Sequence, residues 1–398
     1  MKKVLIASAV FPPEQVTSAL MNYDLAIELS KQYKVTVIRP YPTRPVGKKY
    51  ENADLGDVPF QTILVSSFTH PESQLIGRFR ESISFGKIVA NYIKKHHEDI
   101  DFIYNGGWQL FGYYLIAKAA KKYGIPYMVP IQDIYPESLL TKSKYPSLVN
   151  RIIKSMLLPM DVYYQRNAAC VRTISEEMRD YLSQSRKVPQ SQFLVVNNWQ
   201  NDEDFIALPQ VGKQEKLVFA YVGSINVHAN VDMMIRAFKE AAIPNSEFRI
   251  YGGGNQKEEC QRLVERLKME NVSFDYVDRT QIAQVQAEAD VLLLALPSGN
   301  GEFCLPSKLT SYMLSGKPVL ASVDQGSATK RFIESAQCGK VVSPDRIDEF
   351  ANALRDFTNY TQEERIMMGE RSRMFALEHL TKKANLQKVV EKIGSFLS

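Results

Sequence analysis

The amino-acid sequence predicts an α/β protein made of two doubly wound domains in series. Short β-branched runs alternate with helix-length amphipathic segments from end to end, which is the pattern of parallel sheets covered by helices on both faces. One stretch near residue 200 breaks this pattern. The length of 398 residues, with 45% hydrophobic and 23% charged residues, is enough for two cores and excludes a collagenous, low-complexity or largely disordered chain.

The first domain is expected to span residues 1–200. Its strands are expected at Lys3–Val10, Lys34–Ile38, Thr62–Ser66, Phe102–Tyr104, Tyr127–Ile131, Cys170–Thr173 and Phe193–Val196. Its helices are expected at Thr17–Leu29, Leu75–Lys95, Leu110–Tyr123, Pro146–Arg166 and Ser175–Leu182. The segment from Asn197 to Glu215 lacks hydrophobic periodicity, and we place a linker at residues 201–216.

The second domain is expected to span residues 217–376. Its strands are expected at Leu217–Val222, Glu247–Tyr251, Val272–Asp275, Asp290–Leu296, Val319–Ala321 and Lys340–Val342. The chain ends with three helical patterns, Ile347–Phe357, Thr361–Leu377 and Thr381–Phe396, which is more than the second sheet needs to cover one face. We therefore expect a C-terminal helix within residues 377–398 that can pack back on the first domain.

The formal charge of +5 is unevenly distributed. Up to Trp199 there are 25 basic and 17 acidic residues, a charge of +8, and the remainder carries −3. This asymmetry is typical of contact with phosphates or an anionic membrane, although a solvated surface explains it equally well. Two helices, Leu75–His97 and Pro146–Arg166, mix basic and apolar residues and could rest on anionic lipid; ordinary covering helices are the alternative we favour.

Several classes of protein lose their support. Four distant cysteines (Cys170, Cys260, Cys304 and Cys338) form no disulfide framework, and we expect free thiols in a reducing cytoplasm. The apolar run after Lys3 is too short for a signal peptide, and no later run can span a bilayer, so membrane contact is expected to be peripheral. The histidines show no metal-ligand spacing, and no GxSxG or Walker A motif occurs, so we expect no metal site.

Three loops of the second domain are suited to binding a nucleotide, because open α/β sheets bind ligands at the carboxyl ends of their strands. The turn Gly223-Ser224-Ile225-Asn226 could hold a phosphate, with a plain tight turn as the alternative. The run Gly252-Gly253-Gly254 lacks the third glycine of a dinucleotide fingerprint, and could line a base or ribose or form only a turn. Pro306 is placed to begin a helix, so Ser307 and Lys308 suit a diphosphate; a solvated lysine is the alternative.

Two loops of the first domain are candidates for sugar binding. The loop from Phe11 to Ser18 brings hydroxyl groups and a helix start to the expected cleft. The loop Gln132-Asp133-Ile134-Tyr135-Pro136-Glu137-Ser138 follows an apolar strand, and its acidic and aromatic groups could orient a sugar. A role of Asp133 in a turn or helix cap is equally compatible with the sequence.

Taken together, the motifs of the second domain resemble the donor-binding half of retaining GT-B glycosyltransferases of family four. The residues that carry the resemblance are Gly223-Ser224, Gly252-Gly253-Gly254, Leu305-Pro306-Ser307-Lys308, Tyr312 and Gly316-Lys317-Pro318-Val319-Leu320. The Gln132 to Ser138 loop is similar to the loop found in the branch of this family that builds bacterial capsule and O-antigen repeats, which includes fucosamine transferases. The resemblance covers essentially the whole chain and implies a GT-B fold, with two Rossmann-like domains facing a central cleft.

The resemblance also implies an activity. The enzyme would move a hexosyl or acetamidohexosyl group, with retention, from a nucleotide-diphosphate sugar, expected to be a UDP-sugar, to a glycan or polyprenyl-diphosphate-linked acceptor. It would need no metal and no cofactor beyond this co-substrate, and it would bind no nucleic acid. The expected setting is capsule, O-antigen or exopolysaccharide synthesis in the cytoplasm, at the inner face of the membrane.

The residue roles implied by the resemblance divide between the domains. Asp133 and Lys308 would be catalytic. The donor would contact Gly223, Ser224, Asn226, Gly253, Gly254, Arg279, Glu302, Pro306, Ser307, Leu309 and Ser311. The acceptor would contact Glu14, Thr17, Ser18, Trp108 and Tyr135.

The sequence departs from the family pattern at three places. The two positions of the common Glu-x7-Glu motif hold Phe303 and Ser311, and Glu302 is offset by one. The usual Arg and Lys after the first donor-domain strand are replaced by Ser224 and Ala229. The Gly-Gly of the first loop is replaced around Gln15-Val16-Thr17. A sugar-nucleotide epimerase on the same fold and a two-domain sugar-binding protein remain alternatives, and a dehydrogenase is the weakest rival.

Overall fold

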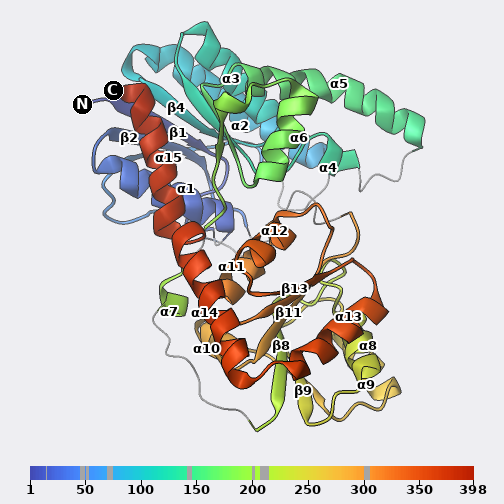
Figure 1. The fold of residues 1–398 in the computed structure, drawn as a ribbon. Coiled ribbons are helices and arrows are strands. Elements are labelled where there is room, and N and C mark those ends of the chain that lie inside the picture. The colour runs from blue at the N-terminus through green and yellow to red at the C-terminus, as the bar shows by residue number, and fades with distance from the viewer. Residues whose placement is uncertain are drawn as a thin grey trace. The chain divides into compact units, whose positions relative to one another are not determined.

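The computed structural model describes residues 1–14, 16–44, 50, 53–69, 75–140, 146–199, 202–206, 215–299 and 305–398, without the side chains of Leu75 and Arg279. The chain forms two compact units (Figure 1). Unit 1 comprises Met1–Gln200 and Asn385–Ser398, and unit 2 comprises Asn201–Ala384. Each unit is a parallel sheet with helices on both faces, which confirms the predicted fold class.

Unit 1 contains a seven-stranded parallel sheet of order β3-β2-β1-β4-β5-β6-β7. Its strands are β1 (Lys3–Ser8), β2 (Lys34–Pro40), β3 (Gln61–Val65), β4 (Phe102–Gly106), β5 (Tyr127–Ile131), β6 (Cys170–Thr173) and β7 (Phe193–Val195). Its helices are α1 (Thr17–Ser30), α2 (Leu75–His96), α3 (Phe111–Lys122), α4 (Glu137–Leu140), α5 (Ser147–Arg166) and α6 (Glu176–Arg186). The structure adds α4, which is too short to show a helical period in the sequence.

The C-terminal helix α15 (Lys382–Leu397) contributes to the core of unit 1. Its residues Val389, Ile393 and Leu397 share a buried cluster with residues of β1 and α1. The Phe396 ring stacks on Phe102 of β4, with ring centroids 5.7 Å apart. Burial of this apolar side of α15 explains why the chain carries one helix more than the second sheet requires.

Unit 2 contains a six-stranded parallel sheet of order β10-β9-β8-β11-β12-β13. Its strands are β8 (Leu217–Val222), β9 (Ser246–Tyr251), β10 (Val272–Asp275), β11 (Val291–Ala295), β12 (Val319–Ser322) and β13 (Gly339–Val342). Its helices are α7 (Glu203–Ile206), α8 (Val231–Ala241), α9 (Lys257–Arg266), α10 (Ile282–Ala287), α11 (Ser307–Leu314), α12 (Ala328–Ser335), α13 (Ile347–Asp356) and α14 (Gln362–His379). Short 3₁₀ turns at His97–Asp99, Gln190–Gln192, Arg279–Gln281 and Phe357–Asn359 complete the two units.

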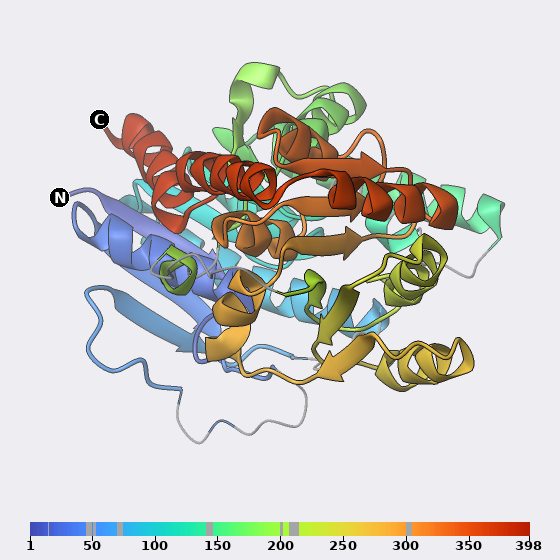
Figure 2. The same ribbon diagram turned by 60° about the horizontal axis from the view of Figure 1, so that its bottom comes forward.

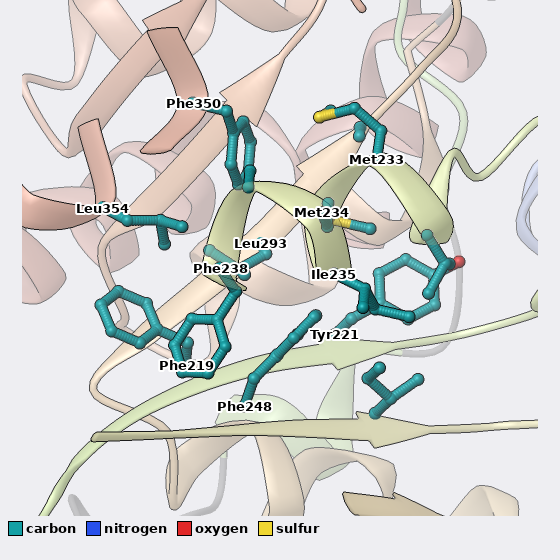
Figure 3. Packing of buried hydrophobic residues seen from close by; sticks show 14 of the residues in the cluster. Phe219, Tyr221, Met233, Met234, Ile235, Phe238, Phe248, Leu293, Phe350 and Leu354 are labelled. Atoms are coloured by element: carbon teal, nitrogen blue, oxygen red, sulfur yellow. The ribbon is translucent and has the colours of Figure 1, made fainter. Parts of the chain in front are cut away.

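Two buried clusters cover the two faces of the second sheet. Helices α8, α9 and α13 pack on one face, where Phe219, Tyr221 and Phe248 from the strands meet Ile235 and Phe238 of α8 (Figure 3). Helices α10, α11, α12 and α14 cover the other face (Figure 2). The central strands β8, β11 and β12 are buried on both sides and are continuous apolar runs, and this is why the sequence located them.

The strand order fixes where each unit can bind a ligand. The order reverses between β1 and β4 in the first sheet and between β8 and β11 in the second. Loops leaving the carboxyl ends of two such strands diverge to opposite faces of the sheet and open a crevice between them. The loop after β8 and the segment between β11 and α11 therefore border the binding region of unit 2, and the loops after β1 and β4 border that of unit 1.

Candidate functional site

The closest convergence of predicted residues joins Gly223, which follows β8, to Lys308 in the first turn of α11. A Cβ atom on Gly223 would overlap Cε of Lys308 and lie 3.1 Å from its Cδ and 3.2 Å from its Nζ. Gly223 also has a φ of +152°, a conformation that side chains rarely adopt. Glycine is therefore favoured at 223 by its backbone conformation, and a side chain there would also displace the flexible end of the lysine.

The Lys308 side chain is half-buried, and its ammonium group lies 5.5 Å from the centre of the Tyr221 ring. Within the described ranges the ammonium has no hydrogen bond and no ion pair with a carboxylate. Burial lowers its pKa below the ordinary value. Burying a cation without a carboxylate partner costs free energy, because the cation loses its hydrating water. The positive end of the α11 helix dipole adds to this cost. A bound anion such as a diphosphate would offset both effects.

Two buried tyrosines hold the backbone around Gly223 in place. The Tyr221 hydroxyl donates a hydrogen bond to the Ser224 carbonyl at 2.7 Å. The Tyr312 hydroxyl, from α11, accepts from the Val222 N–H at 2.9 Å and donates to the Val222 carbonyl at 3.2 Å. Burial raises the pKa of both hydroxyl groups, so they remain neutral donors. The loop after β8 is thus fixed by side chains of its own strand and of the helix that carries Lys308.

The glycine run after β9 has mainly a structural purpose. A Cβ on Gly252 would overlap the Gly223 carbonyl oxygen, and one on Gly254 would overlap the Ile225 carbonyl oxygen. The two loops are joined by backbone hydrogen bonds, including Ile225 N–H to the Gly253 carbonyl at 2.8 Å. Gly253, in contrast, has no atom within 4 Å of an added Cβ and faces open space. Of the three, it is the position best placed to border a ligand.

Other predicted donor residues lie around this centre. Ser224 and Ser307 are exposed, and the half-buried Asn226 donates to the Ser224 hydroxyl at 3.1 Å. Pro306 directly precedes α11, as expected. Glu302 lies outside the described residues. The backbone of Arg279 begins a 3₁₀ turn capped by Asp278, and its side chain also lies outside the described set.

Leu309 and Ser311 differ from the prediction because both side chains are buried, with exposures of 0% and 6%. Leu309 belongs to the apolar cluster under α11. The Ser311 hydroxyl donates to the Lys308 carbonyl at 2.9 Å and accepts from the Gln286 amide at 3.3 Å. These contacts use both side chains inside the protein, and we keep neither as a donor contact below.

In unit 1, the loop after β5 presents Asp133 and Tyr135. The Asp133 side chain is exposed, whereas Tyr135 is half-buried. Burial raises the pKa of Tyr135; the Asp133 carboxylate adds to this rise and the Arg78 guanidinium opposes it. Asp133, Tyr135 and Arg78 therefore share one electrostatic environment at the carboxyl edge of the first sheet.

A buried arginine, which sequence reasoning missed, holds this loop. All five N–H groups of Arg186 have partners: the Tyr135 carbonyl at 2.8 Å, both oxygens of Glu137 at 3.0 and 2.6 Å, Asp161 at 2.6 Å and the Ser185 hydroxyl at 3.1 Å. Burial by itself would raise the pKa of Glu137, but hydrogen bonds from Arg186 and its charge prevail and lower it to about 2. Glu137, one of the acidic groups expected to orient a sugar, instead anchors the loop.

Trp108 follows β4 and is half-buried beside two guanidinium groups. Those of Arg44 and Arg78 lie 4.6 and 5.3 Å from the ring centre. Both arginines contact the buried carboxylate of Glu81, Arg44 at 2.8 Å and Arg78 at 3.4 Å. The indole, Tyr135 and these cations give the edge of unit 1 the aromatic and polar surface that carbohydrates bind. Arg44 and Arg78 were missed as parts of this edge, because contacts across the fold leave no local sequence pattern.

The predicted residues of the first loop divide between interior and surface. Glu14 is 3% exposed, and its carboxylate accepts the backbone N–H groups of Thr43 and Arg44 at 2.7 and 2.9 Å. It orders the segment after β2, and we do not keep it as an acceptor contact. Thr17 is exposed as the first residue of α1, and Ser18 is half-buried.

Two cavities lie away from the predicted catalytic residues. A shallow groove of about 530 Å³ between β13 and α13 is lined by residues including Gln325 and Lys340. A cavity of about 190 Å³ between α8 and α9 is bordered by Asn226 and Gln256. Among the residues that the structure describes, no group of three or more His, Cys, Asp or Glu side chains is arranged to hold a metal ion.

Comparison with protein families gives one match for each half of the chain. Residues 204–375 match the model described as "Glycosyl transferases group 1". Residues 19–203 match the model described as "Glycosyltransferase Family 4".

Individual relatives are distant, and only the solved structures match along almost the whole chain. A probable glycosyltransferase, WbjE of Pseudomonas aeruginosa, is 21% identical over 231 residues, which is 54% of this chain and 56% of that protein. The chain thus spans about half the length of this curated relative. The crystal structure of Anabaena HepE in complex with UDP matches with a TM-score of 0.70 and 16% identity, over 99% of this chain and 100% of that one. The lipopolysaccharide outer core galactosyltransferase WaaB matches with a TM-score of 0.66 and 18% identity, over 99% of each chain.

Proposed function

This chain belongs to the glycosyltransferases of GT-B fold, and we propose that it transfers a sugar from a nucleotide-diphosphate sugar to a glycan or lipid-linked acceptor. Unit 2 would bind the donor and unit 1 the acceptor. The observation that carries this proposal is the position of Lys308: a half-buried cation at the point where the strand order of unit 2 reverses, with no carboxylate partner among the described residues.

The proposed reaction exchanges one bond to the anomeric carbon for another. The bond from this carbon to the diphosphate oxygen breaks, and the acceptor hydroxyl oxygen forms the new glycosidic bond as it gives its proton to the departing diphosphate. Negative charge accumulates on the departing nucleoside diphosphate. The Lys308 ammonium and the N–H groups at the start of α11 would stabilise that charge, which is the usual electrostatic contribution in reactions of this kind.

Asp133 would contact the transferred sugar near the anomeric carbon. Its loop is held from behind by Arg186 through the Tyr135 carbonyl and Glu137. Trp108, Tyr135, Thr17 and Ser18 would bind the acceptor. Gly223, Ser224, Asn226, Gly253, Gly254, Pro306 and Ser307 would border the donor. Arg279 and Glu302 stay in the proposal as donor residues on the sequence resemblance.

The finer parts of the proposal concern the donor, stereochemistry and setting. We propose a UDP-sugar, since HepE was crystallised with UDP. We also propose retention at the anomeric carbon, catalysis without a metal, and a cytoplasmic enzyme of capsule, O-antigen or exopolysaccharide synthesis at the inner face of the membrane. The name of WaaB, a lipopolysaccharide galactosyltransferase, is compatible with such a setting.

The decisive experiment replaces Lys308 and measures nucleotide binding and transfer separately. Lys308→Ala should weaken UDP binding measured by calorimetry at least 30-fold and reduce transfer at least a hundredfold, with little change in thermal stability; Lys308→Arg should restore part of both. Near-normal transfer by Lys308→Ala would overturn the diphosphate role. Interconversion of the donor sugar without any acceptor would identify an epimerase instead.

Two further measurements test stereochemistry and metal use. Nuclear magnetic resonance of the product reports the anomeric configuration, and an inverted product would contradict retention. Treatment with EDTA should leave transfer unchanged; a loss of activity that Mg²⁺ or Mn²⁺ restores would contradict catalysis without a metal.

A further inference from the structure

The N-terminal half of α5 exposes an apolar stripe. Leu148, Val149, Ile152 and Met156 retain 65%, 38%, 52% and 69% of their surface. At 3.6 residues per turn they fall within an arc of about 100°. The buried residues of α5, such as Leu157, lie outside this arc and face the interior of unit 1. We refer to these four side chains as the α5 stripe. A contiguous apolar surface of this kind generally marks a contact site.

The charges next to the α5 stripe are basic. From Ser147 to Met160 the sequence contains Arg151 and Lys154 and no acidic residue, and Arg151 is exposed beside the stripe. Helix α14 provides a contrast. It exposes Ile366, Met367 and Met374, but the exposed charged residues of α14 are acidic: Glu363, Glu364, Glu370 and Glu378. The two helices share exposed apolar surface and differ in the sign of the charge around it.

We propose that the α5 stripe docks unit 1 on the surface of an anionic lipid bilayer. The apolar side chains would enter the boundary between headgroups and acyl chains, while Arg151 pairs with lipid phosphates. The basic excess of the first half of the chain is complementary to such a surface. A second copy of the chain fits less well, because pairing two stripes would bring like charges together. None of the described helices is long and apolar enough to cross a membrane, so the contact would be interfacial.

The docking helix is connected to the proposed acceptor loop. Lys154 of α5 pairs with Glu137 at 3.1 Å, and the same carboxylate pairs with Arg186, which holds the Tyr135 carbonyl. A bilayer that orients α5 would therefore orient the loop of Asp133 and Tyr135. This inference rests on the proposed function for its consequence, which is that a lipid-linked acceptor reaches the loop from the membrane surface.

Vesicle sedimentation tests the inference without donor or acceptor. The full chain should bind vesicles of phosphatidylcholine mixed with phosphatidylglycerol at least tenfold more tightly than vesicles of phosphatidylcholine alone. Ile152→Ser combined with Met156→Ser should weaken this binding at least tenfold, and Arg151→Glu should also weaken it. The matched control is Met367→Ser with Met374→Ser on α14, which should bind as the parent does. These side chains are exposed, so all variants should keep the parent unfolding temperature within a few degrees.

The opposing results are equally specific. The inference is overturned if the parent protein does not sediment with anionic vesicles, or if the α5 variant binds them as tightly as the parent. It is also overturned if the α5 substitutions leave vesicle binding intact and instead abolish a dimer seen by analytical ultracentrifugation. Calorimetry with UDP on the same preparations separates the two proposals. A protein that binds UDP but not vesicles contradicts only the membrane contact of α5. A protein that binds vesicles but not UDP contradicts only the proposed role of Lys308.

Discussion

The stem of Lys308 lies where a residue other than glycine at position 223 would carry its Cβ atom, so the lysine packs directly against the backbone of Gly223. The two residues belong to segments that follow β8 and β11, far apart in the sequence. They meet because these strands are neighbours at the point where the strand order reverses. The strand order and one glycine therefore determine the position of the Lys308 side chain at the carboxyl edge of the second sheet.

We first predict the effect of Gly223→Ala. The new methyl group would overlap Cε of Lys308 and would force the ammonium away from its place on Tyr221. The unfolding free energy should fall by about 1 to 3 kcal/mol because alanine is strained at a φ of +152°, and kcat/KM for the donor should fall about a hundredfold because the lysine is displaced. Gly326→Ala is the control, because no atom lies within 4 Å of its added Cβ. Equal kinetics of the parent and Gly223→Ala would refute the argument.

A second prediction concerns the energetic cost of Lys308 in the free enzyme. Its pKa is lowered in the folded state, so between this pKa and the ordinary one the unfolded chain binds more protons, and stability should rise with pH across that interval. At neutral pH the Lys308→Met variant should be as stable against unfolding as the parent. Its stability should not show the rise with pH. UDP binding should nevertheless weaken at least 30-fold, from about 2 kcal/mol of lost interaction. Urea unfolding at neutral and alkaline pH measures the first effect, and calorimetry the second.

Tyr221→Phe separates the two contacts of this tyrosine. The ring that lies beneath the Lys308 ammonium is kept, while the hydrogen bond from the hydroxyl to the Ser224 carbonyl is lost. We expect a loss of about 1 kcal/mol in stability and a higher KM for the donor, with the Lys308 contribution to UDP binding retained. Tyr221→Leu removes the ring as well and should weaken UDP binding further. Identical UDP affinities of the Phe and Leu variants would show that the ring does not support the cation.

The Arg186 and Glu137 pair predicts a specific sensitivity to acid. The pKa of Glu137 is about 2 in the folded protein and near its ordinary value of 4.5 when unfolded. Its contribution to stability is therefore present above pH 4.5 and is lost as the pH falls toward 2. Urea unfolding between pH 6 and pH 3 should show this loss, and Glu137→Gln should show a shallower one. A parallel pH dependence of the parent and Glu137→Gln would contradict the assignment.

Arg186→Met should be more severe than Glu137→Gln. It would leave Asp161 buried without its cation and would free the Tyr135 carbonyl. A cost of about 3 to 5 kcal/mol is expected for a broken buried ion pair.

The sequence located elements better than contacts. Strands β5, β6 and β8 have the predicted bounds, because strands buried on both faces leave apolar runs that punctuating residues delimit. The edge strand β10 also has the predicted bounds, although its residues alternate between half-buried and exposed. The glycines of the loop after β9 were recognised, but their purpose was not: two of them admit the carbonyl groups of a neighbouring loop. Leu309 and Ser311 were assigned to a donor on the family resemblance, and both side chains are buried.

The sequence by itself determined two doubly wound domains and the loops at the carboxyl ends of their strands, because hydrophobic period and turn residues are local properties. The tertiary structure decided which of those loops meet. Gly223 contacts Lys308, Arg186 holds Glu137, and four apolar residues of α5 stay uncovered, as consequences of strand order and helix packing. Such contacts join residues distant along the chain, and their energies depend on burial and partners that exist only once the sheets have formed.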